Sequence, residues 1–190
     1  MPLSTPAPRA LIHKRRVSCD GFERNDGLWD IEGHMTDVKT YDMENRDRGG
    51  IIPTGEPLHG MSIRLTIDLD FLVHDVEAVI DYSPFNYCPG IVDQFKQLIG
   101  HRIEPGWTQL TRRLFGGVKG CTHLQELLGP MATTAFQATH LARKQRQVET
   151  ASGERPALIN TCHALGESSP VVRDFWPDFY QPPGNDGDER

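Results

Sequence analysis

The sequence predicts an α+β domain in which an antiparallel sheet packs against helices. Segments 28–36 and 61–70 alternate apolar and polar residues, as strands with one buried face do. An Asp26-Gly27 pair marks a tight hairpin between the first two strands. Three later segments instead gather their apolar residues on one helical face, which indicates helices that cover the sheet.

Four strands are expected in the first half of the chain. Residues 16–42 form two strands joined at Asn25-Asp26-Gly27, and residues 43–58, rich in glycine and proline, form a loop. A fourth strand, from Val73 to Tyr82, returns beside the third. The third strand spans residues 61–70, and its core face carries Met61, Ile63, Leu65, Ile67 and Leu69.

Three helices are expected to follow. The first spans residues 89–100, with Cys88 beside its N-cap, and the second spans residues 105–115. The third begins with Thr122 and Gln125 at the spacing of a capping box. Their apolar faces carry Ile91, Val92, Phe95, Leu98 and Ile99 in the first helix, Trp107, Leu110 and Leu114 in the second, and Leu124, Leu127, Leu128, Met131 and Ala135 in the third.

The two ends of the chain differ in composition from the part between them. Residues 1–15 are rich in proline and polar side chains and are predicted to form a disordered arm. Residues 182–190 are predicted to be a flexible acidic tail. Residues 16–181 are then expected to form a single domain, in which residues 137–149 extend the third helix and residues 157–166 add a strand or a short segment.

Charge and hydropathy exclude several classes of protein. The formal net charge of the 190 residues is −6, and the one basic cluster, residues 13–16, is short, so we expect no nucleic-acid partner. No apolar run approaches the roughly 20 residues that span a bilayer, and the N-terminus lacks the apolar core of a signal peptide. These observations predict a cytoplasmic protein without a membrane partner.

The four cysteines are far apart, match no C-x-x-C pattern and are expected to be free thiols: Cys19, Cys88, Cys121 and Cys162. Cys88 and Cys121 precede predicted helices, where the free N–H groups and the helix dipole favour a thiolate. The alternative is that each is a small buried hydrophobic residue. The glycines at 116, 117 and 120 do not form a phosphate-binding P-loop, so no nucleotide cofactor is expected.

The strand at residues 28–36 carries a second candidate set. Alternation places Asp30, Glu32 and His34 on one face, where two carboxylates can orient the imidazole as a general base. These three residues are the candidate catalytic residues. The alternative is the solvated face of a hairpin, and the catalytic interpretation gains weight only if this face looks onto Cys88 and Cys121.

Three blocks of the chain resemble a bacterial family. The segments DGLWDIEGHMTDVKTYD, GEPLHGMSIRLTID and GGVKGCTHLQELLGPMATTAFQ resemble the domain-of-unknown-function family numbered 2889, over most of residues 16–165. This resemblance implies kinship and no particular reaction.

Residues 57–139 also resemble, in the order of their parts, the iron–sulfur scaffold proteins of the NifU/IscU type. The resemblance implies a NifU/IscU-like core with an added N-terminal β-hairpin. It places His59, Cys88 and Cys121 at the three cysteine positions of the scaffolds. The chain departs from the pattern because His59 replaces a thiolate and Met61 replaces an aspartate.

The functional prediction is a metalloprotein with Zn or Fe held by His59, Cys88 and Cys121, since imidazole and thiolate are good ligands of both metals. Water, His123 or a carboxylate such as Asp30 would be the fourth ligand. The leading hypothesis is a small metal-dependent enzyme acting on an unknown acidic or acyl small-molecule substrate. The alternatives are an iron–sulfur cluster or sulfur carrier or scaffold that serves a metal or sulfur acceptor protein, and a metal-free binding module.

Overall fold

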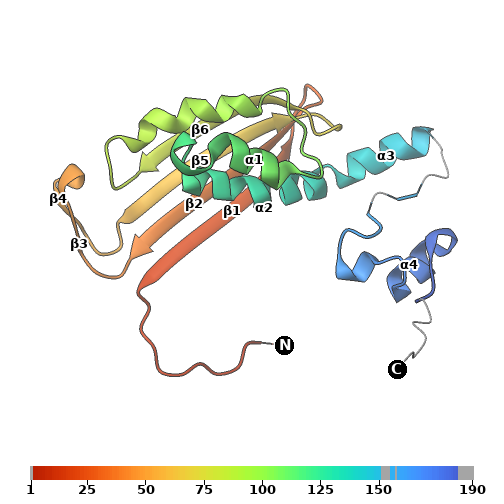
Figure 1. Ribbon diagram of the computed structural model, residues 1–190, viewed down its shortest axis with the longest axis horizontal. Helices are drawn as coiled ribbons and strands as arrows, with labels where there is room; N and C mark the ends of the chain where they lie inside the picture. The colour runs from red at the N-terminus through yellow and green to blue at the C-terminus, as the bar shows by residue number, and fades with distance from the viewer. Residues whose placement is uncertain (1, 151–154, 157, 184–190) are drawn as a thin grey trace. The chain divides into compact units, whose positions relative to one another are not determined.

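The computed structural model describes residues 2–150, 155–156 and 158–183 (Figure 1). The chain divides into two compact units, Met1–Gln145 and Arg146–Arg190. The predicted division into a disordered arm, a single domain and a flexible tail is not tested by these two units and stays a prediction. The first strand begins at His13, inside the predicted arm, and most of the predicted tail lies outside the described residues.

The first unit is built on a four-stranded antiparallel sheet with the order β1-β2-β5-β6. Its strands are β1 (His13–Glu23), β2 (Trp29–Lys39), β5 (Pro57–Ile67) and β6 (Val73–Tyr82). The turn between β1 and β2 contains Gly27 at a φ of 83°, which glycine adopts without strain. The four predicted strands and the α+β class are therefore confirmed.

The predicted loop at residues 43–58 contains regular structure. The short strands β3 (Met43–Asn45) and β4 (Gly50–Ile52) pair antiparallel around the 3₁₀ turn η1 (Arg46–Arg48). The side chain of Asn45 accepts a hydrogen bond from the backbone N–H of Arg48 and so caps this turn. Strands of three residues are too short to show a hydropathy period, which is why the sequence does not predict them.

One face of the sheet is covered by helices (Figure 1). Helix α2 (Thr122–Ala138) packs on β1, β2 and β5, and the 3₁₀ helix η2 (Cys88–Leu98) packs on β6. Helix α1 (Trp107–Phe115) packs between η2 and α2, and η3 (Gly117–Lys119) joins α1 to α2. Helix α3 (His140–Thr150) follows α2 along the chain and crosses the division between the units.

The second unit contains the described elements η4 (His163–Leu165), α4 (Pro170–Phe175) and η5 (Pro177–Phe179). Ser169 caps α4 by accepting a hydrogen bond from the N–H of Val172. None of the helices among the described residues is long and apolar enough to cross a membrane.

The core lies between the covered face of the sheet and the helices. The odd-numbered residues of β2 from Trp29 to Asp37 face the helices and are buried, whereas the even-numbered ones face the open side of the sheet. All five residues of the predicted stripe on the third helix are buried, as expected. The predicted capping box is wrong: Cys121 is the N-cap of α2, and no side chain makes a capping hydrogen bond there.

The other two helices depart from their predicted stripes. The first is a 3₁₀ helix, in which only Phe95 and Leu98 of the expected face are fully buried and Ile99 is exposed. In α1 the buried residues are Trp107, Thr111 and Phe115, and Leu110 is half-buried. Phe115 stacks on Phe95, so contact with η2 decides which side of α1 is buried.

Two glycines let α2 approach the sheet closely. A Cβ atom built on Gly21 would lie 2.4 Å from Cβ of Ala138. A Cβ atom built on Gly33 would lie 2.6 Å from Sδ of Met131. These separations are shorter than van der Waals contact. A side chain at position 21 would push α2 away from β1, whereas one at position 33 would first displace the flexible side chain of Met131.

Gly21→Ala is expected to lower the free energy of unfolding by about 2 kcal/mol, because the Cβ of Ala138 belongs to the helix and cannot rotate away. Urea unfolding followed by circular dichroism measures this. Adding Ala138→Gly should recover about half of the loss. Gly90→Ala, which meets no atom within 4 Å, should cost less than about 0.5 kcal/mol. Equal losses of stability in Gly21→Ala and Gly90→Ala would contradict the close contact between Gly21 and Ala138.

Candidate functional site

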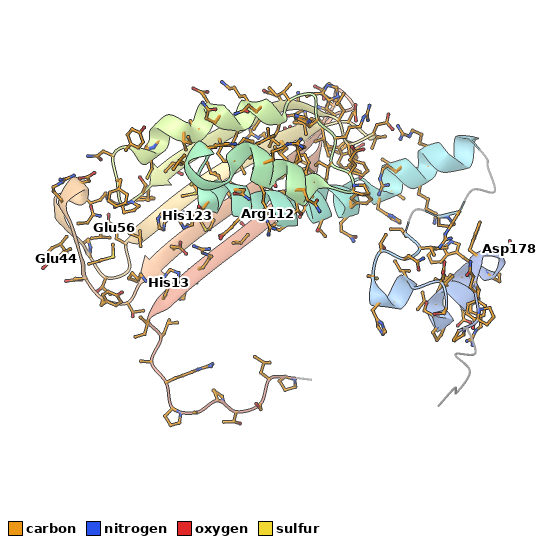
Figure 2. The ribbon with its side chains drawn as sticks, in the orientation of Figure 1. His13, Glu44, Glu56, Arg112, His123 and Asp178 are labelled. Carbon is orange, nitrogen blue, oxygen red and sulfur yellow. The ribbon has the colours of Figure 1, made fainter. Side chains whose placement is uncertain are left out.

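Four polar side chains meet around one buried carboxylate, that of Asp37, at an end of the helix-covered face. We call the five residues together the Asp37 cluster: Asp37, His13, Arg15, His59 and His123. Strand register places Arg15 of β1 and His59 of β5 on either side of Asp37 in β2, and α2 contributes His123. Figure 2 labels His13 and His123 at the end of the sheet where β1 begins.

Asp37 is the centre of the cluster, with 1% of its surface exposed. Arg15 donates two hydrogen bonds to it, from Nε to Oδ1 and from Nη2 to Oδ2, each 2.8 Å long. His13 Nε2 lies 3.1 Å from Oδ1, and His59 Nδ1 lies 3.1 Å from Oδ2. The carboxylate thus has a partner on each oxygen in addition to the guanidinium.

Burial alone would raise the pKa of Asp37, but the hydrogen bonds and charge of Arg15 and the hydrogen bond from His59 outweigh it and lower the pKa from 3.8 to about 2. Asp37 is therefore ionised at neutral pH. An ionised carboxylate accepts hydrogen bonds only, so Nδ1 of His59 donates to it and Nε2 keeps its lone pair.

The two imidazoles beside Asp37 lie against each other. The ring centroids of His59 and His123 are 4.0 Å apart. Burial, and then the neighbouring His123, lower the pKa of His59, while burial, and then the charge of Arg15, lower the pKa of His123. Both rings are consequently neutral at pH 7, the form in which histidine binds metals.

The cluster has the geometry of a ligand set. Asp37, His59 and His123 each offer one ligand atom, and the three atoms lie within 4.8 Å of one another. In a tetrahedral zinc site with bonds of 2.0–2.1 Å, neighbouring ligand atoms are about 3.3 Å apart. The Oδ2 atom of Asp37 lies 3.1 Å from His59 Nδ1 and 3.8 Å from His123 Nε2. Binding of a metal by Nδ1 of His59 would require its proton to move to Nε2 and its hydrogen bond to Asp37 to break.

Arg15 opposes metal binding, because its guanidinium already occupies both carboxylate oxygens of Asp37. It also has a second anion within reach: its Nη1 donates a 2.7 Å hydrogen bond to Glu126 on α2. Glu126 is half exposed, whereas Asp37 is not. The cation therefore has an alternative partner at the surface if a metal ion takes Asp37.

Comparison with known proteins identifies the family. The family model described as protein of unknown function (DUF2889) matches residues 13–137. The chain belongs to this family. No curated protein and no solved structure matches it. The matched region begins with β1 and ends within α2, so in this DUF2889 chain it includes all five residues of the Asp37 cluster.

The structure separates the three predicted metal ligands. His59 lies in the Asp37 cluster. Cys121 precedes His123 by two residues, but its thiol contacts Sδ of Met61 at 3.9 Å and packs against the core. Cys88 begins η2 and also packs against the core. The one group of three ligands found among the described residues contains no cysteine.

The predicted catalytic residues lie on the other face of the sheet from the cluster. Asp30, Glu32 and His34 project from the open face of β2, as their alternation predicted. Their partners come mainly from the neighbouring strand β5: Thr66 bonds Asp30, Arg64 bonds Glu32 and Ser62 bonds His34. Glu32 and His34 line a shallow depression there. This face does not look onto Cys121, so the catalytic interpretation gains no support from that neighbourhood.

Sequence reasoning named His59 as a ligand and His123 as a possible fourth ligand, and it missed the other three residues of the cluster. Residues 13–16, which include His13 and Arg15, were read only as a short basic cluster, and Asp37 was not considered. A signal for Asp37 does exist: it continues the odd-numbered series of Ile31, Gly33 and Met35, so the strand period places a carboxylate on the buried face. A buried carboxylate requires a partner of opposite charge.

Asp37→Asn is expected to lower the free energy of unfolding at pH 7 by about 2 kcal/mol. This is the free energy that corresponds to lowering the pKa of Asp37 from 3.8 to about 2 on folding. Because the folded pKa is below the unfolded one, this stability is present above pH 3.8 and is lost as the pH falls to about 2. The variant should therefore lack that part of the acid destabilisation. Denaturant titrations from pH 7 to pH 2 measure it.

The matched control is Asp93→Asn, at an exposed carboxylate on η2, which should keep the wild-type pH dependence. If Asp37→Asn and Asp93→Asn lose stability in parallel over this range, Asp37 is not the compensated buried charge described above.

Proposed function

We propose that the chain is a metalloprotein that holds one Zn or Fe ion at Asp37, His59 and His123. The observation that carries this proposal is the convergence of two neutral imidazoles on one buried carboxylate, with ligand atoms within 4.8 Å of one another. Two histidines and one carboxylate are the ligands of many zinc hydrolases and non-haem iron enzymes. Three protein ligands leave positions open for water and a substrate.

A small metal-dependent enzyme acting on a small-molecule substrate is therefore the proposed activity. His13 lies beside the ligands, 3.1 Å from the other oxygen of Asp37, and would be the nearby candidate for a general base if a metal were held there. Arg15, once released from Asp37, is a cation suited to an acidic or acyl substrate. These roles replace those first assigned to Asp30, Glu32 and His34.

The proposal keeps His59 as a ligand and exchanges Cys88 and Cys121 for Asp37 and His123. A thiolate site, an iron–sulfur carrier or scaffold of the NifU/IscU type that serves a metal or sulfur acceptor protein, and a metal-free binding module remain the competing hypotheses. The carrier hypothesis receives less support, because the two thiols do not join His59 in a compact group among the described residues.

Metal content of the untagged protein, purified without oxygen from medium supplemented with zinc and iron, tests the proposal. We expect about one metal ion per chain in the wild type, in Cys88→Ser and in His34→Ala. His59→Ala and His123→Ala should each lose it, because two ligands do not hold the ion. Elemental analysis gives the count, and circular dichroism checks that each variant is folded.

Either of two results would overturn this ligand set. Loss of the metal in Cys88→Ser and Cys121→Ser, with retention in His123→Ala, would establish the thiolate site. A folded wild type without metal would leave the metal-free binding module. Acid-labile sulfide in the same samples separates a cluster from a single ion.

Arg15→Gln is expected to raise the affinity for Zn²⁺ by roughly tenfold or more, because it removes the cation that competes for Asp37. Competition with a chromogenic chelator measures the affinity. Arg16→Gln is the matched control, since residue 16 projects from the opposite face of β1 and should leave the affinity unchanged. An equal or lower affinity in Arg15→Gln would show that Arg15 does not compete with the metal.

A further inference from the structure

Strand β1 forms one edge of the sheet, and within the described part of the first unit no strand pairs with its outer side. The opposite edge strand, β6, has η2 packed against it. Ten of the eleven residues of β1 are exposed, and Cys19 is half-buried. Val17 and Phe22 are exposed by 48% and 50%. A long edge strand with open backbone groups is a template for pairing with another strand.

The charges of β1 are divided between its two halves. The first half carries His13, Lys14, Arg15 and Arg16, and the second half carries Asp20 and Glu23. A parallel copy of this strand would place like charges beside each other, whereas an antiparallel copy places opposite charges beside each other. The strand is therefore complementary in charge to itself in one direction only.

One antiparallel register pairs opposite charges on both faces of the strand. With Ser18 opposite Ser18 of the second copy, Arg16 lies opposite Asp20 on the open face, and His13 lies opposite Glu23 on the helix-covered face. No like charges are paired. Lys14 lies opposite Phe22, so its aliphatic stem and ammonium can cover an exposed ring.

A groove beside the edge fits the same register. It lies between β1 and α2 and is lined by Cys19, Asp20, Pro130 and Thr134, among others. Val17 of the second copy would lie opposite Cys19 on the helix-covered face, and its apolar side chain would enter this groove. The pairing would thus bury Val17, which the single chain leaves exposed.

We propose that the β1 edge docks a second copy of this chain, with the two β1 strands antiparallel about a two-fold axis at Ser18. The two sheets become one sheet of eight strands, and because both copies use the same patch the assembly closes as a dimer. Strand pairing supplies backbone hydrogen bonds, and the charges select the direction. The proposal does not depend on metal binding.

Sedimentation velocity of the full-length protein tests the dimer. Concentrations from about 1 to 100 µM would bracket a dissociation constant in the micromolar range. We expect a reversible dimer whose dissociation constant rises at least tenfold in Arg16→Glu and in Asp20→Lys. The double variant Arg16→Glu/Asp20→Lys should have a dissociation constant close to that of the wild type. In it, positions 16 and 20, which lie opposite each other in the proposed register, again carry opposite charges. Arg112→Glu and Glu44→Lys, which change charge at exposed positions of α1 and β3 (Figure 2), should have no effect.

The register has its own test. In a chain with Cys19→Ser and Cys162→Ala, a Ser18→Cys substitution should form a disulfide between copies on mild oxidation, and Asp20→Cys in the same chain should not. A protein that stays monomeric at 100 µM overturns the proposal. A dimer that tolerates both charge reversals, or whose double variant is weaker than either single one, shows that the copies meet elsewhere.

Discussion

The burial of Asp37 is the constraint on which this end of the molecule depends. The period of β2 places its odd-numbered side chains against α2, and Asp37 follows the last apolar one, Met35. A carboxylate removed from water is stable as an ion only if donors and positive charge replace its hydration. β1 supplies Arg15 and β5 supplies His59. The ionised carboxylate of Asp37 therefore links β1, β2 and β5 through side-chain contacts near the start of α2.

The same arrangement suits a functional site better than a purely structural pair. One guanidinium would have been enough to neutralise Asp37, yet three imidazoles also lie within 3.1 to 3.8 Å of its oxygens. By contrast, the open face pairs its exposed charges locally, as Arg64 does with Glu32 and Glu77, and exposed pairs of this kind contribute little to stability. The buried carboxylate with its guanidinium and imidazole partners is thus on the covered face.

Much of the fold could be predicted from local patterns. The strands β2 and β5 and the buried stripe of α2 follow from periods of 2 and 3.6 residues, which depend only on neighbours in sequence. The 3₁₀ geometry of η2 and the buried side of α1 depend on contact between Phe95 and Phe115, and no local pattern contains that contact.

The candidate site was harder to predict, because its members are distant in sequence. Resemblance led to His59 and to the start of α2, which contribute to the Asp37 cluster, but it also pointed to Cys88 on η2, beside β6. The register between strands sets Arg15 and His59 beside Asp37, and the period within a single strand does not contain it. Membership of the DUF2889 family supplies no reaction, so the proposed chemistry rests on the geometry of the Asp37 cluster.

Nuclear magnetic resonance of ¹⁵N-histidine-labelled protein during a zinc titration tests the central claim most directly. The account predicts that ring nitrogens of His59 and His123 shift to metal-bound values at one equivalent of zinc, while His34 on the open face does not change. Unchanged signals of His59 and His123 with saturable zinc binding would contradict it, and would place the metal outside the Asp37 cluster.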